Sequence, residues 1–324
     1  MGRVKFAARR LAQGVIALLL IAVVNFFLIR AAPGDPASVM AGEAGAGDAK
    51  FVTQLRQQFG LDKSLPEQLG IYLGHVATLD LGQSYRRQRP VADLIGERVP
   101  ATLMLTASAF VMSLLFGITL GAWSSSRAGT WADSAVTTVA LVFYATPLFW
   151  VALMAVLIFS VQLDWLPAFG MTTVGGGFSG FGHALDVIRH LVLPATTLAL
   201  FYMAIYARMT RTAMLDVSRM DFIKTARAKG VPSGRIWRAH ILRNALLPII
   251  TLAGIQAGQM VGGAILTETV FAWPGIGRLM FEALLERDYN LLLGVFLFTA
   301  AMVVLFNLVT DIVYTLVDPR IELT

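Results

Sequence analysis

Few residues in this chain have the types and spacing needed for covalent chemistry. Ser179 stands in the tetrapeptide Gly-Phe-Ser-Gly at 177–180, and a serine becomes a nucleophile when a base lies within hydrogen-bond reach. His183 and His190 are near it only in the sequence, and the apolar run 291–317 contains no histidine. The chain has no cysteine, which excludes disulfides, thiolate metal sites and cysteine nucleophiles. We therefore interpret these glycines as a flexible loop.

The same tetrapeptide resembles the Gly-x-Ser-Gly motif of rhomboid intramembrane serine proteases, which take their histidine from a late membrane helix. A rhomboid-like protease is kept only as an alternative, because the late run has no such residue. No G-x-x-x-x-G-K-[ST] stretch is present either, so the chain lacks the loop that cradles the phosphates of ATP. We predict that the chain is not an enzyme and binds no metal or cofactor.

The most distinctive local pattern is DFIKTARAKGVPSGRIWRAHILRNALLP at 221–248. It holds six Lys or Arg and a single acidic residue, Asp221, in a chain that is 56% apolar. Asp221 can cap a helix, Gly230 can end it in a left-handed conformation, and Pro232 prevents its continuation. The pattern predicts a helix of about two turns.

One face of this short helix would carry small residues that permit close approach. Its members are Phe222, Thr225, Ala226 and Lys229. A second helix is predicted from Ser233, with an apolar stripe that can lie under a membrane. That stripe consists of Ile236, Trp237, His240 and Ile241. Attraction of a polybasic loop to anionic lipid, about 1 kcal/mol per basic residue, is an alternative use of this segment.

The rest of the chain is dominated by long apolar runs. Six runs have the length of roughly 20 residues, or more, that is needed to cross a hydrocarbon core of about 30 Å. They are residues 11–29, 101–123, 135–160, 190–208, 246–267 and 291–317. The first is too long for the apolar part of a cleaved signal peptide, so we expect it to remain. The predicted fold class is an all-α polytopic membrane protein with six transmembrane helices.

This reading divides the chain into five parts. They are an N-terminal tail (1–10), transmembrane helix 1 (11–30), an external segment with short helices (31–100), a core of five helices (101–317) that includes the loop 209–245, and a C-terminal tail (318–324). Fifteen Lys and Arg lie in the two tails and the short loops on one side, against three in the short loops opposite. Because positive loops stay cytoplasmic, both termini and the loop 209–245 are predicted to be cytoplasmic.

Two further sets of residues are candidates for functional contacts. Small and polar residues in the fifth run would pack against a neighbouring subunit or line a path: Gly254, Gln256, Gly258, Gln259 and Gly262. The external stretch ETVFAWPGIGRL is predicted to be an interfacial anchor, an external gate or a contact for a binding protein. Its candidate residues are Glu268, Phe271, Trp273, Pro274 and Gly275.

The stretch TARAKG, followed after eleven residues by Leu242, resembles the EAA loop of ABC-importer permeases of type I. Other stretches resemble the dipeptide, oligopeptide and nickel branch of that family: PGDPA, LDLGQSYRRQRPV, ERVPATLMLT, ETVFAWPGIGRL and NLVTDIVYTLVDPR. Lys224 stands at the position of the name-giving Glu, and Arg243 replaces the usual Pro after Leu242. In that family the short helix docks into a cleft of an ATPase subunit.

The resemblance implies a permease subunit in a bacterial inner membrane. Its partners would be a second, similar permease, two cytoplasmic ATPases that bind ATP and Mg, an extracytoplasmic solute-binding protein and membrane lipid, without nucleic acid. The implied ATPase-docking residues are Asp221, Phe222, Lys224, Thr225, Ala226, Arg227, Lys229 and Gly230. The cargo could be a dipeptide, an oligopeptide, a nickel chelate or glutathione. A self-contained secondary transporter is the main alternative, although such proteins usually show two related halves and membrane-embedded charges.

Overall fold

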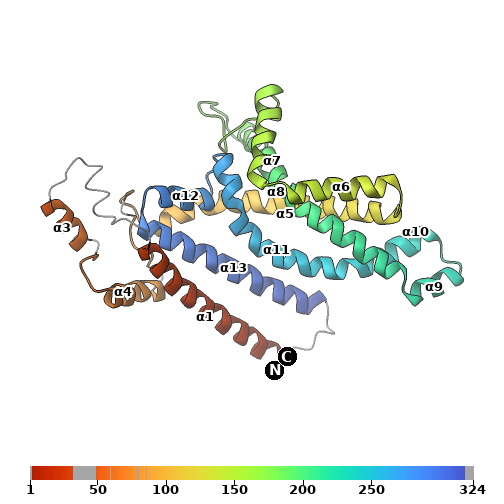
Figure 1. The fold of residues 1–324 in the computed structure, drawn as a ribbon, viewed down its shortest axis with the longest axis horizontal. Coiled ribbons are helices and arrows are strands. Elements are labelled where there is room, and N and C mark those ends of the chain that lie inside the picture. The colour runs from red at the N-terminus through yellow and green to blue at the C-terminus, as the bar shows by residue number, and fades with distance from the viewer. Residues whose placement is uncertain (1, 32–48, 59, 79, 85, 318–324) are drawn as a thin grey trace. The chain divides into compact units, whose positions relative to one another are not determined.

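The computed structural model describes residues 2–31, 49–58, 60–78, 80–84 and 86–317, and its regular elements are helices (Figure 1). They are α1 (Gly2–Ala31), α3 (Ala49–Gln58), α4 (Leu65–Ala77), α5 (Val91–Ser126), α6 (Trp131–Ala145), α7 (Leu148–Ala155), α8 (Phe181–Ser218), α9 (Asp221–Ala228), α10 (Ser233–Arg235), α11 (Arg243–Val270), α12 (Ile276–Leu285) and α13 (Tyr289–Val317). Among the described residues, five helical stretches are long and apolar enough to cross a membrane, or six if the bent pair α6 and α7 counts as one span. The predicted all-α membrane fold is confirmed.

The third predicted span, 135–160, is not one straight helix. α6 and α7 are bent by 103° relative to each other, and the break falls at Thr146 and Pro147. Thr146 is extended, with φ −80° and ψ 133°, because a residue before proline is driven out of the helical region. α7 then continues as a π-helical segment, Val156–Gln162. The apolar composition predicted the span, but not its break.

α5 and α8 are longer than the predicted runs 101–123 and 190–208. α8 has 38 residues, which corresponds to about 57 Å at 1.5 Å per residue, whereas a hydrocarbon core is about 30 Å thick. A run of apolar residues indicates only the part of a helix that lies in lipid. The predicted runs are therefore shorter than α5 and α8, because the polar ends of these helices extend beyond the lipid.

The chain divides into two compact units. Unit 1 comprises residues 1–100, 275–308 and 322–324, and unit 2 comprises 101–274 and 309–321. The core of unit 1 joins the start of α5 to α12 and to the start of α13. Its buried members include Val91, Ile95, Leu279, Ala283 and Leu291. Within this unit Phe26 of α1 stacks on Tyr72 of α4, with ring centroids 5.8 Å apart.

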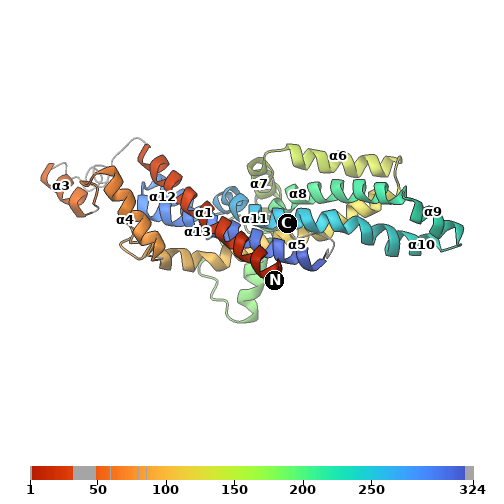
Figure 2. The ribbon, with the colours of Figure 1, turned by 90° about the horizontal axis from the view of Figure 1, so that it is seen from below.

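Unit 2 is built around α8. This helix contacts both α6 and α11 and lies between them in the view of Figure 2. The buried core of the unit joins α5, α8 and α11. Its large, almost completely buried members include Leu105, Leu198, Tyr206, Met260 and Trp273.

α5 and α8 approach each other closely at two glycines. A Cβ atom on Gly121 would lie 2.3 Å from the carbonyl oxygen of Ala207, and one on Gly117 would lie 2.6 Å from Cβ of Tyr206. These glycines are four residues apart and share one helix face. Helices in lipid associate through such small-residue contacts because burial against lipid supplies no hydrophobic drive.

Gly121→Ala should destabilise the protein, because the added methyl group meets backbone atoms of α8 that cannot rotate away. Overpacking costs about 1–3 kcal/mol, so we expect a lower melting temperature of the purified protein in detergent. Gly96→Ala on the same helix is the matched control, since a Cβ there meets nothing within 4 Å. This control should be neutral or slightly stabilising. Equal melting temperatures for both variants would contradict the close contact.

Candidate functional site

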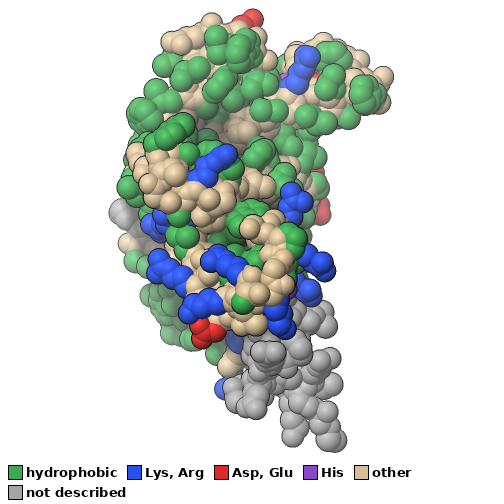
Figure 3. All heavy atoms as spheres, turned by 90° about the vertical axis from the view of Figure 1, so that its right-hand side faces the viewer, with side chains coloured by type: hydrophobic (Ala, Val, Ile, Leu, Met, Phe, Trp, Pro, Cys, Tyr) green, Lys and Arg blue, Asp and Glu red, His purple; other side chains and the backbone are tan. Residues whose placement is uncertain are grey.

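The basic segment forms the turn between α8 and α11. α8 ends at Ser218, α9 follows two residues later, and Ser233 starts the helical stretch that leads into α11. Figure 3 faces the α9 side of Figure 1 and shows Lys and Arg side chains gathered there, with few acidic side chains among them. The predicted short helix is confirmed, and it presents a positively charged surface of unit 2.

Ile223 anchors α9 to the rest of unit 2. Its side chain is 0% exposed and packs with Met214 and Val217 of α8 and with Ile236 and Ile241 beyond the turn. Full burial of such a side chain contributes about 1.5–3 kcal/mol. One apolar face therefore holds this short helix in place.

The opposite face of α9 is open. Phe222 is 42% exposed, and Thr225 and Lys229 are exposed as well. Ala226, which the sequence placed on the same face, is half-buried and packs against the Ile223 cluster. Of the residues predicted for the docking face, Phe222, Thr225 and Lys229 are therefore exposed, whereas Ala226 packs partly inward.

Asp221 is not the cap of α9. Met220 occupies the capping position, and no side chain caps the helix. Asp221 is the first helical residue, and its Oδ1 accepts a hydrogen bond of 2.7 Å from Nζ of Lys224. Both side chains are strongly exposed, so this ion pair contributes little stability. It does neutralise the lysine that stands at the position of the family's glutamate.

Gly230 ends α9 as predicted, with φ +76°. Its N–H donates to the carbonyl oxygen of Arg227, and the N–H of Val231 donates to that of Ala226. These two bonds form a Schellman motif, which requires a left-handed residue at this position. A Cβ on Gly230 would meet nothing within 4 Å, so any substitution there is opposed by backbone strain and not by crowding.

The stripe predicted to lie under the membrane is instead directed into the protein. Ile236 and Ile241 are buried, and Trp237 packs against the same cluster. α10 and the π-helical segment Ile236–Leu242 run directly into α11. The predicted second helix therefore consists of α10 and this π-helical segment, and it continues directly into α11. These apolar side chains are therefore buried against other apolar residues of unit 2 and not against lipid.

The predicted stripe on α11 has mixed surroundings. A Cβ on Gly254 would lie 2.0 Å from Cγ2 of Thr310, whose Oγ1 donates to the Gly254 carbonyl oxygen at 3.0 Å. This glycine therefore packs against the chain's own α13, which corrects its assignment to a partner interface. Gly258 is buried, while Gly262 lies outside the residues whose surroundings are described.

The two glutamines of α11 also differ. Oε1 of Gln256 is buried and has no hydrogen-bond partner among the described residues. Gln259 is exposed. Of these two glutamines, Gln259 is the one whose side chain is exposed on the surface of the chain.

The external candidates are mostly interior residues. Glu268, Phe271 and Trp273 are almost completely buried. Oε1 of Glu268 accepts a 2.7 Å hydrogen bond from Thr102, and Nε1 of Trp273 donates to the carbonyl oxygen of Ala101 at 2.8 Å. Direct contact of these three side chains with a binding protein does not fit their burial. Pro274 is half-buried and Gly275 is buried.

Ser179 is exposed on its loop. His190 is buried, and its Nδ1 lies 2.8 Å from the carbonyl oxygen of Asp186. Within the described part of the chain no hydrogen bond joins Ser179 to a histidine, and no group of three or more His, Cys, Asp or Glu side chains could hold a metal ion. The loop has no arrangement suited to a serine nucleophile.

A buried ion pair in unit 2 was missed from the sequence. Arg211 of α8 donates two hydrogen bonds to the Asp133 carboxylate, from Nε at 2.6 Å and from Nη2 at 2.7 Å. Ser124 of α5 and the N–H of Gly129 donate to the same carboxylate. A carboxylate with this many donors ties three helices together. Asp133 at the start of an otherwise apolar run was the available signal.

A second missed cluster fastens the stretch LDLGQSYRRQRPV within unit 1. The buried Asp288 carboxylate accepts hydrogen bonds from the Ser84 hydroxyl and, at 3.1 Å, from the N–H of Arg86. Arg87 donates to Glu282 of α12 at 2.8 Å. Burial disfavours the charged form of Glu282, but the hydrogen bond from Arg87 and the charge of Arg278 outweigh it and hold its pKa below the usual value.

The described residues form helices that can span a membrane, with a short charged helix in one loop. The structure resembles that of the MetNI methionine ABC transporter in inward-facing conformations, with a TM-score of 0.55, 18% identity, and coverage of 69% of this chain and 96% of that one. This likeness shows the shared fold.

The family is shown by the sequence. Residues 100–323 match the binding-protein-dependent transport system inner membrane component, and residues 3–106 match its N-terminal family. The chain belongs to this family. It is 40% identical to the dipeptide transport system permease protein of Alkalihalophilus pseudofirmus, over 98% of this chain and 99% of the relative. It is 39% identical to the di/tripeptide transport system permease protein of Pseudomonas aeruginosa, over 98% of each chain.

The chain is thus a multi-pass inner-membrane permease subunit of a binding-protein-dependent ABC transport system. Its partners include an ABC ATPase and a binding protein. ATP hydrolysis takes place in the separate ATPase subunits, and the permease itself binds no cofactor.

The Glu282 contact predicts a pH-dependent loosening of unit 1. A carboxyl group with a lowered pKa in the folded state stabilises that state above its unfolded pKa, and this stabilisation is lost as the pH falls through the folded pKa. We expect hydrogen-exchange protection of the Arg86 and Arg87 amides to fall from pH 7 towards acidic pH, more in the wild type than in Glu282→Gln. Protection in this variant should already be reduced at neutral pH. Identical profiles in the two proteins would contradict the assignment.

Proposed function

We propose that this permease subunit transports peptides, as di- or oligopeptides delivered by the binding protein. The relatives named for dipeptide and di/tripeptide transport are 40% and 39% identical to it over 98% of the chain. Support also comes from the stretches in both units that resemble the peptide branch. A test is uptake of radiolabelled dipeptides by cells that carry the full set of subunits, with and without this chain.

We further propose that the open face of α9 docks into a cleft of an ATPase subunit. The observation that carries this proposal is the exposure of Phe222 on a helix whose other face is fixed by Ile223. A large apolar side chain surrounded by Lys and Arg is a typical anchor at a protein interface. When the ATPases close on ATP, a docked α9 would move with them and pull α8 and α11, which are joined to it.

For the assembly, we propose two ATPases on the cytoplasmic side, a second homologous permease in the membrane and the binding protein outside. The chain termini and the loop 209–245 would be cytoplasmic, because Lys and Arg concentrate on that side. Gln259 of α11, which is exposed, is the residue we assign to the second permease or to the transport path. The rival reading, a secondary transporter, leaves the open face of α9 without a use.

Phe222→Asp should release the ATPases and leave the membrane core folded, since Phe222 is exposed and its replacement disturbs no buried packing. Loss of a central aromatic anchor costs about 2 kcal/mol or more, roughly a thirtyfold loss of affinity. The measurement is co-purification of the ATPase subunits with a tagged permease. Phe178→Asp is the control, because Phe178 is also exposed but lies outside α9.

Gly230→Val should weaken docking as well, because a β-branched residue resists φ +76° and the end of α9 would unwind. ATPases retained at wild-type levels by both Phe222→Asp and Gly230→Val would overturn the docking proposal. Loss of ATPases from Phe178→Asp would show that the effect is not specific to α9.

The purified chain alone should hydrolyse neither ATP nor a membrane-embedded peptide, and Ser179→Ala should leave transport unchanged. The physical reason is the missing phosphate loop and the absence, among the described residues, of a histidine bonded to Ser179. Cleavage of a fluorogenic transmembrane substrate is the readout. Activity that disappears in Ser179→Ala would support the protease alternative.

A further inference from the structure

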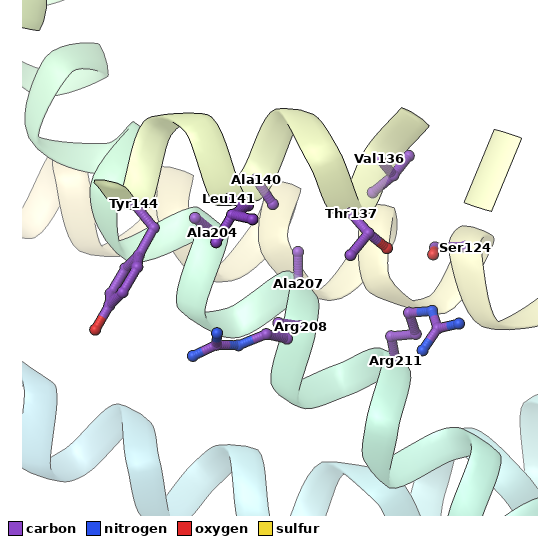
Figure 4. Close-up of a pocket in the computed structure, with 10 residues that line it drawn as sticks. All are labelled: Ser124, Val136, Thr137, Ala140, Leu141, Tyr144, Ala204, Ala207, Arg208 and Arg211. Carbon is purple, nitrogen blue, oxygen red and sulfur yellow. The ribbon is translucent and has the colours of Figure 1, made fainter. Parts of the chain in front are cut away.

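An apolar groove runs between α6 and α8 near the end of α8 that leads to α9 (Figure 4). Its volume is about 190 Å³, less than the roughly 300 Å³ at which drug-sized ligand pockets begin. Ala140 and Leu141 line it from α6, and Ala204 and Ala207 line it from α8. A small groove with a largely apolar lining can hold a segment of one hydrocarbon chain.

One of the positively charged side chains that line the groove, Arg208, is exposed and is not paired with a described carboxylate. Two arginines of α8 line the groove, but Arg211 is neutralised by Asp133. Arg208 is exposed, and among the described residues no carboxylate pairs with it. Its guanidinium lies 5.4 Å from the ring centroid of Tyr144, and this contact leaves its N–H groups available to an acceptor.

Neighbouring residues indicate the depth of the groove in a membrane. Arg208 ends the apolar run 190–208, and the hydrocarbon boundary is expected there. Trp131 is strongly exposed at the start of α6, and Arg127 lies 4.5 Å from the ring centroid of Trp123. Tryptophan and arginine concentrate at the level of lipid headgroups. Arg208 therefore lies where a phosphate group would be.

We propose that this groove binds an anionic phospholipid, with one acyl chain between α6 and α8 and the phosphate held by Arg208. The proposal places the lipid in the inner leaflet, which rests on the orientation given under Proposed function. Such a lipid would fix α6 against the helix that continues to α9. A helix of a partner protein would need an acidic residue opposite Arg208 to fill the same place.

The test is lipid binding by the purified permease in native mass spectrometry, with added phosphatidylglycerol or phosphatidylcholine. We expect tighter binding of phosphatidylglycerol, and Arg208→Gln should weaken it about fivefold, as expected for one basic residue at a lipid surface. Binding of phosphatidylcholine should change little. Arg189→Gln is the matched control, because Arg189 is exposed on the same helix towards its other end.

Two further variants keep the test decisive. Ala140→Phe fills the groove and should weaken binding of both lipids, whereas an effect confined to Arg208→Gln would still support the phosphate contact. The proposal is overturned if Arg208→Gln binds phosphatidylglycerol as the wild type does, or if inorganic phosphate alone displaces the lipid. It is also overturned if Leu141→Cys crosslinks efficiently to the second permease in the assembled transporter, since protein would then cover the groove. None of these measurements depends on peptide transport.

Discussion

The backbones of α5 and α8 meet at Gly117 and Gly121, and the architecture of unit 2 depends on that contact. In lipid, apolar side chains gain little by leaving the solvent, so helices associate where their backbones can approach and van der Waals contact is dense. Without side chains at these positions, α5 reaches the backbone of Ala207. α8 can then contact α6 and α11 with its remaining faces. A wider spacing would also separate the donors and acceptors around Asp133.

Three buried carboxylates, one or more in each unit, follow one rule. Asp133 is met by Arg211, Glu268 by Thr102, and Asp288 by Ser84. Each pairing joins segments distant in the sequence, so a carboxylate placed in an apolar interior also fixes the register between helices. Desolvation makes an unpaired charge far more costly than a paired one. The exposed basic side chains of α9 and Arg208 are the ones that we propose to contact partners.

α9 shows how a short helix is held in place by its attachment to longer ones. An isolated helix of 8 residues is unstable in water, and its charged ends add little. Ile223 and the Schellman motif at Gly230 attach it to α8 and to the start of α11. Any displacement of α9 is therefore passed to two long helices. The same attachment explains why only one of its faces is open, and why Ala226 belongs to the interior.

The sequence by itself determined the helical membrane class, the existence of α9 and its end at Gly230. Apolar length, basic clustering and glycine φ preference are local properties, and each acts without reference to the rest of the chain. The family could be identified because its motifs are short contiguous stretches. The start of α9 was predicted less accurately. Asp221 is a residue type that often caps helices, but it is the first residue inside α9.

Only the tertiary structure decided which side chains lie inside. Ala226 and Thr225 are adjacent and both small, yet one faces the Ile223 cluster and the other faces outward. The spacing of Gly254 was read as a partner interface, although Thr310 of the same chain fills that site. The same spacing at Gly117 and Gly121 was overlooked. A pattern of small residues indicates that another helix can approach closely. Which helix approaches depends on contacts between residues far apart in the chain.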